Sequence, residues 1–162
     1  MRYQLRQKFW TLTNDFTIQD HAGRDVVRVT GKFFSFGHDL TFRDMGGQEL
    51  LRIKQQLLNW GPTFAITQGD TELAVVKKHL FTFFNCKFTV DVPGPDDLEA
   101  TGSFLEHDYR FERHGEPVAQ VSKQWLTLTD YYGVDIAPGE NDALILASVV
   151  VIDLCCHDGG DD

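Results

Sequence analysis

Residues 143–152 of the chain read ALILASVVVI, in which Ser148 is the one polar position. The preceding five residues, PGEND, suit the entry to a helix, with Asn141 or Asp142 as the N-cap. A helix without a polar face must be buried on every side. The stretch therefore predicts a buried central helix over about residues 141–154. A buried central strand is the alternative, because three valines follow one another.

This apolar segment is too short to cross a membrane. Ten of the twelve residues from Ala143 to Leu154 are apolar, and as a helix they span about 18 Å, against about 30 Å for a bilayer core. Burial stabilises the fold by about 1.5–3 kcal/mol for each of these side chains. This segment is therefore the largest single block of apolar burial in the chain. We therefore expect no transmembrane segment and a helix inside the protein.

Upstream of this segment, one pattern recurs: an alternating strand, a polar turn that contains glycine, and a second strand that ends at lysine. Alternation places one side of each strand in a core and the other in water, and a turn glycine supplies the positive φ that closes two strands. The strand pairs are Phe16–Ile18 with Val27–Lys32, Leu40–Phe42 with Leu51–Lys54, Phe64–Ile66 with Leu73–Lys78, and Tyr109–Phe111 with Ala119–Lys123. Their turn glycines are Gly23, Gly47, Gly69 and Gly115. The pattern predicts a series of β-hairpins.

Further strands are expected between and beside these hairpins. Residues 87–104 predict a fifth hairpin around a turn at residues 93–97, and residues 5–12 and 125–136 predict additional strands. Roughly a dozen short strands with turns between them are typical of an all-β sandwich or barrel. A barrel closed around the apolar helix accounts for both parts of the sequence.

Composition limits the classes of protein to consider. The 162 residues suit one domain of ordinary size, and 42% apolar with 24% charged residues exclude a disordered or fibrous chain. The net charge of −9 argues against nucleic-acid binding. The N-terminal MRYQLRQKFW lacks the apolar core of a secretory signal, and Cys86, Cys155 and Cys156 predict free thiols in a reducing compartment. We expect a cytoplasmic protein.

Several stretches resemble the LURP-one-related family: residues 3–8 (YQLRQK), 31–37 (GKFFSFG), 82–84 (TFF), 122–125 (SKQW), 129–134 (TDYYGV) and 142–153 (DALILASVVVID). The resemblance implies a mainly β fold of roughly twelve strands, a closed antiparallel barrel around a hydrophobic C-terminal helix. This is the fold of the tubby C-terminal domain and the phospholipid scramblases. We expect residues 1–157 to form one such domain and residues 158–162 an acidic tail.

The same resemblance says less about function. Tubby domains bind phosphoinositide head groups through basic side chains, and scramblases are associated with lipid movement. No tubby phosphoinositide motif and no scramblase calcium-binding stretch is identifiable in this sequence. The resemblance implies no catalytic activity.

Five lysines occupy comparable places at the ends of second strands: Lys32, Lys54, Lys77, Lys78 and Lys123. In a barrel these places lie along one rim, where the lysines would form an anion-binding patch on an otherwise acidic protein. The favoured interpretation is that they blunt strand ends and keep edges from pairing. The functional hypothesis is an anion or lipid site made by the same residues.

Other candidate groups have simpler explanations. The His-Asp pairs at 38–39, 107–108 and 157–158 do not predict a metal site by their spacing, and turn polarity accounts for the first two. No nucleophile motif or phosphate-binding loop is present. For the Phe-rich residues 33–36 and 81–84 we expect core packing, with a membrane contact as the alternative.

These observations favour a non-enzymatic binding module that recognises a phospholipid head group or a protein partner, in the cytoplasm or peripherally at a membrane. One alternative is a metal-assisted hydrolase that uses His and Asp residues from several turns. The other is a purely structural component of an assembly. We expect no cofactor, no metal and no nucleic-acid partner.

Overall fold

The computed structural model describes residues 1–7, 15–32, 37–56, 61–80, 86–124 and 130–157. The strands are β1 (Arg2–Arg6), β2 (Asp15–Asp20), β3 (Asp25–Lys32), β4 (Asp39–Asp44), β5 (Glu49–Gln55), β6 (Thr63–Gln68), β7 (Thr71–Leu80), β8 (Cys86–Asp91), β9 (Leu98–Ser103), β10 (Asp108–Arg113), β11 (Glu116–Ser122) and β12 (Tyr131–Ile136). A helix, α1, spans Asp142–His157. The Phe-rich residues 33–36 and 81–84, residues 8–12 and 125–129 of the two predicted additional strands, and the acidic tail lie outside the described residues. The described part of the predicted strand at 125–136 contains β12.

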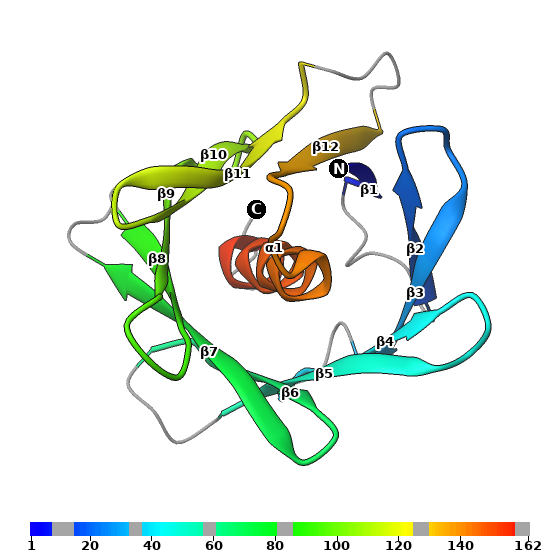
Figure 1. Ribbon diagram of the computed structural model, residues 1–162, viewed down its shortest axis with the longest axis horizontal. Coiled ribbons are helices and arrows are strands. Elements are labelled where there is room, and N and C mark those ends of the chain that lie inside the picture. The colour runs from blue at the N-terminus through cyan, green and yellow to red at the C-terminus, as the bar shows by residue number, and fades with distance from the viewer. Residues whose placement is uncertain (8–14, 33–36, 57–60, 81–85, 125–129, 158–162) are drawn as a thin grey trace.

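The strands form a closed antiparallel barrel in which each strand pairs with its neighbours in sequence and β1 pairs with β12. Figure 1 shows the ring of strands with α1 in its middle. The N-terminus completes the closure, because the Met1 ammonium donates to the Ile136 carbonyl at 2.6 Å and the Ile136 amide donates to the Met1 carbonyl at 2.9 Å. The predicted twelve-stranded barrel is confirmed.

Two ends of the barrel differ in their connections. Because consecutive strands alternate in direction, all odd-numbered strands finish at one end, which we call the loop end, and all even-numbered strands finish at the other, the turn end. The predicted hairpin turns lie at the turn end, and Gly23, Gly47, Gly69 and Gly115 all have positive φ, between 58° and 92°. The hairpins of the sequence pattern are therefore confirmed.

The apolar segment is a helix, so the strand alternative is wrong. Asn141 is the N-cap, since its side-chain oxygen accepts from the Leu144 amide at 3.2 Å. The helix continues to His157, a few residues beyond the expected end. Its polar Ser148 is satisfied inside the core by donating to the Leu144 carbonyl at 2.9 Å.

The core is the space between α1 and the inward face of every strand. Alternate strand residues point inward, as in β4 and β5, where Leu40, Phe42, Leu51 and Ile53 are at most 1% exposed. They pack against the helix, whose residues 149–152 are fully buried. The helix therefore has no solvent-facing side over these residues, as its composition requires.

We expect Leu146→Asp to prevent folding. Leu146 is 1% exposed, and an unpaired buried charge costs several kcal/mol against a total stability of about 5–15 kcal/mol. Circular dichroism with thermal melting should show no cooperative transition. The control Thr101→Asp places the same charge at an exposed position of β9 and should melt near the wild-type temperature. A cooperatively folded Leu146→Asp protein would contradict the central position of α1.

Candidate functional site

The predicted lysines lie toward the loop end. Lys32 is the last residue of β3, Lys54 lies next to the end of β5, Lys77 and Lys78 lie in the last part of β7, and Lys123 follows β11. Strands β3, β5 and β7 lie along one arc of the ring, whereas β11 is separated from β7 by β8, β9 and β10. The topology thus places the first four along one arc and Lys123 across the ring from them.

The side chains at this end differ in their surroundings. Lys54 and Lys77 are exposed, and the Lys77 ammonium lies 3.1 Å from the Asp91 carboxylate. Lys78 continues the inward face of Ala74 and Val76 and is half-buried. No ion pair joins Lys54 or Lys78 to a carboxylate within the part of the chain that the structure describes. Among the lysines of this arc whose side chains the structure describes, these two are the most available to an external anion, and Lys123 across the ring is likewise exposed.

The last turns of α1 also reach the loop end. Burial raises the pKa of the Cys156 thiol to about 12, although the positive charge of Lys78 opposes this rise. Lys78 lies on the inward side of β7, a strand that contacts α1. Cys86, Cys155 and Cys156 are all free thiols.

A buried polar cluster that the sequence analysis missed joins α1 to the barrel wall at this end. Asp153 of α1 is fully buried and its carboxylate accepts a short hydrogen bond from the Tyr132 hydroxyl. Its other oxygen lies 3.2 Å from Nε2 of His107, in the turn between β9 and β10. The His107 ring stacks on the Tyr132 ring, with 4.1 Å between centroids. One carboxylate thus bonds the helix to β12 and lies against the turn between β9 and β10.

Burial of the tyrosines in and beside this cluster determines their protonation state. Burial raises the pKa of Tyr132 and of Tyr109 well above 10, and the charge of Asp153 adds to the effect in both. The Tyr109 hydroxyl is buried without a hydrogen-bond partner among the described residues. Both phenols therefore stay protonated, and Tyr132 serves the buried carboxylate as a donor.

The expectation that turn polarity accounts for His38 and His107 is wrong, because they are only 1% and 3% exposed. The partner of His107 is Asp153, not its sequence neighbour Asp108. Asp39 likewise pairs with Arg52 through two hydrogen bonds of 2.8 and 2.6 Å rather than with His38. Among the described residues, no group of three or more His, Cys, Asp or Glu side chains is arranged to hold a metal ion.

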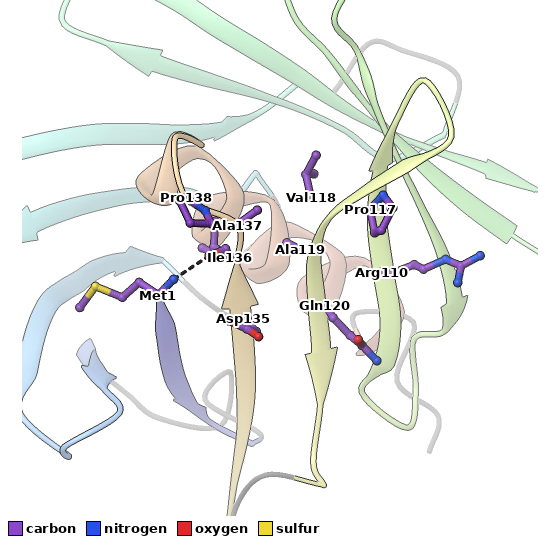
Figure 2. A pocket seen from close by; sticks show the side chains of 10 residues that line it. All are labelled: Met1, Arg110, Pro117, Val118, Ala119, Gln120, Asp135, Ile136, Ala137 and Pro138. Carbon is purple, nitrogen blue, oxygen red and sulfur yellow. Dashed lines mark hydrogen bonds between the residues drawn. The ribbon is translucent and has the colours of Figure 1, made fainter.

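A shallow hollow of about 430 Å³ lies beside β10, β11 and β12. Figure 2 shows Arg110, Gln120 and Asp135 projecting from these three strands. The three residues form one cross-strand row, in which Arg110 lies opposite Gln120 and Gln120 opposite Asp135. A second hollow of about 250 Å³ shares Arg110 and Gln120.

The charges in this hollow are already engaged. Arg110 pairs with Glu112, and Asp135 lies 3.8 Å from Arg2. An anion would have to compete with Glu112 for the one guanidinium that lines the hollow. The loop end is therefore the better candidate for recognising an anion.

Comparisons with known proteins agree with the fold. A family model described as LURP-one-related matches residues 1–153. The uncharacterised protein YxjI of Bacillus subtilis (strain 168) is 27% identical over 158 residues, which cover 98% of this chain and 95% of that protein. An X-ray structure of a protein from Arabidopsis thaliana superposes with a TM-score of 0.67 at 17% identity, covering 94% of this chain and 88% of that one. The resemblance inferred from the sequence is confirmed. No described helix is both long and apolar enough to span a bilayer.

We expect Tyr132→Phe to lower the free energy of unfolding by about 1–3 kcal/mol, because the buried Asp153 carboxylate loses its hydroxyl donor while the ring is kept. Urea denaturation at neutral pH measures the change. Tyr131→Phe, at the neighbouring half-buried position, is the matched control and should change stability by less than about 0.5 kcal/mol. Equal stability of the two variants would refute the role given to the Tyr132 hydroxyl.

We expect Cys156 to react very slowly with a thiol reagent in the folded protein. With a pKa of about 12, only about one thiol in 10⁴ is ionised at pH 8, and the thiolate is the reactive form. A time course with Ellman's reagent should contain a slow phase that disappears in Cys156→Ser. Fast, complete reaction of Cys156 under native conditions would show that the end of α1 is accessible.

Proposed function

The chain belongs to the LURP-one-related family, and on that premise we propose that it is a non-catalytic binding module whose loop end recognises the phosphate-bearing head group of an anionic phospholipid. The observation that carries the proposal is the placement of the lysines. Every lysine that the structure describes, including Lys87 at the start of β8, lies toward the loop end. On a protein with a net charge of −9, this end is where an anion meets local positive charge.

The chemistry of lysine supports a head group as the ligand. An ammonium group offers three donors on a flexible stem, which suits phosphate oxygens whose positions vary. A lysine near an anionic membrane surface contributes about 1 kcal/mol of attraction. Several such lysines together give useful affinity for a membrane surface even without a deep pocket at the loop end.

A peripheral position at the cytoplasmic face of a membrane follows from the same proposal, because anionic lipids are concentrated in that leaflet. An acidic protein partner is the competing occupant of the lysine-rich end, since it would be attracted by the same charges. Binding to protein-free vesicles distinguishes the two occupants, because such vesicles supply the lipid but no protein partner.

We expect the double variant Lys54→Glu/Lys78→Glu to weaken binding to vesicles that contain phosphoinositide by at least about 30-fold. The loss of two attractions of about 1 kcal/mol each gives this factor. Co-sedimentation at about 0.1 M salt measures the affinity, with neutral phosphatidylcholine vesicles as the lipid control.

The matched protein control is Arg2→Glu/Arg24→Glu, which makes the same change in net charge at two exposed arginines at the turn end. This control should bind within a few-fold of the wild type. Equal losses in both variants would show that net charge alone governs binding. If the wild-type protein ignores both kinds of vesicle, the lipid proposal is wrong and pull-downs for an acidic protein partner become the next experiment.

A further inference from the structure

Lysines and most of the described carboxylates lie toward opposite ends of the barrel axis, although Arg2, Arg24, Arg43 and Arg113 lie toward the acidic end. The described lysines lie toward the loop end, whereas each connection at the turn end carries acidic residues. Examples in or beside these connections are Asp20 and Asp25 at β2–β3, Asp44 and Glu49 at β4–β5, Asp70 and Glu72 at β6–β7, Asp96 and Asp97 at β8–β9, Glu112 and Glu116 at β10–β11, and Glu140 and Asp142 at the start of α1. The protein is therefore an electric dipole whose positive end is the loop end.

Acidic residues near the loop end are partly neutralised by arginines. Asp39 is held by both arms of the Arg52 guanidinium, and Asp15 lies 3.7 Å from Arg28. Such pairs leave Lys54 and Lys78 as uncompensated charges along the arc of β3, β5 and β7, where Lys77 pairs with Asp91. Glu106 and Asp108 are exposed at the turn between β9 and β10, on another part of the ring from these lysines but beside Leu105 in sequence, where they oppose the approach of an anionic surface.

The separation between the two ends decides how such a dipole meets a charged surface. The 16 residues of α1 run from the turn end to the loop end, which corresponds to about 24 Å. The Debye length is about 8 Å at physiological ionic strength, so charges about three Debye lengths from a surface are nearly screened. A barrel lying on its side would instead bring acidic and basic ends equally close to the surface.

We infer that the partner is an extended anionic surface, a lipid bilayer, and that the barrel meets it end-on with the loop end inward and α1 close to the membrane normal. This inference rests on the proposed function and adds the geometry of binding to it. In this orientation the lysines lie within a Debye length of the lipid head groups. The acidic turn end points into solution, where its repulsion is screened.

An exposed leucine lies at the end that would contact the bilayer. Leu105 is 65% exposed in the turn between β9 and β10. The turn is held from both sides, because Phe104 packs edge-on against Phe88 at 5.0 Å and His107 is fixed by Asp153. Leu105 is therefore presented on a firm support. At the turn end, Met45 is a comparable apolar side chain and is 46% exposed.

These two positions provide the test. A polarity-sensitive fluorophore is attached to Leu105→Cys or to Met45→Cys in a background with Cys86, Cys155 and Cys156 replaced by alanine. Each labelled protein is titrated with phosphoinositide-containing vesicles and followed by co-sedimentation and emission. We expect the label at position 105 to shift to shorter wavelength on binding and the label at position 45 not to shift.

A second measurement on the unmodified chain guards against effects of the substitutions. Hydrogen exchange followed by mass spectrometry should show vesicle-dependent protection of residues 104–107 and none at residues 45–48. Vesicle binding with a shift or protection at position 45, or equally at both ends, would overturn the end-on orientation and leave the proposed function standing. No vesicle binding by the unmodified chain would overturn both.

Discussion

The structure depends on one constraint, which is that a helix apolar on every side must be enclosed on every side. A flat sheet would cover one face of α1, and a two-layer sandwich would leave its flanks open. A closed ring of antiparallel strands covers the whole circumference and leaves no sheet edge. The alternation of each strand follows from this, because the inward residues pack against the helix and one another while the outward residues face water.

Apolar packing alone does not fix the rotation of a uniformly apolar helix about its axis. The buried Asp153 supplies that information, because its carboxylate must meet Tyr132 on β12 and His107 beside β10. Rotation of α1 would leave the carboxylate without a donor, at a cost of several kcal/mol. The cluster also ties the helix to the turn that presents Leu105, so the interior and the proposed membrane-facing surface are mechanically connected.

Most of the fold was predictable because its signals are local. The glycine at each hairpin turn, the two-residue alternation of the strands and the cap at Asn141 are all encoded within a few residues. The Asp153 cluster was not predictable, because its members lie on β12, on a distant turn and on α1, and only the closed ring brings them together. One signal was present in the sequence: an aspartate interrupts the apolar run just before Leu154. That the lysines lie toward one end of the barrel could be predicted from the alternating direction of the strands. That the Lys78 side chain points inward could be seen only from the register of β7.

The closure between β1 and β12 has a consequence for how the chain is made. The ring joins the first strand to the last, and the helix that fills it is synthesised after all twelve strands. Until that helix emerges from the ribosome, the inward faces of the strands have nothing to cover them. Long-range pairings of this kind form slowly and expose apolar surface on the way. Folding of the barrel must therefore wait until α1 has been made after all twelve strands, and a chain that still lacks α1 is a natural client for chaperones.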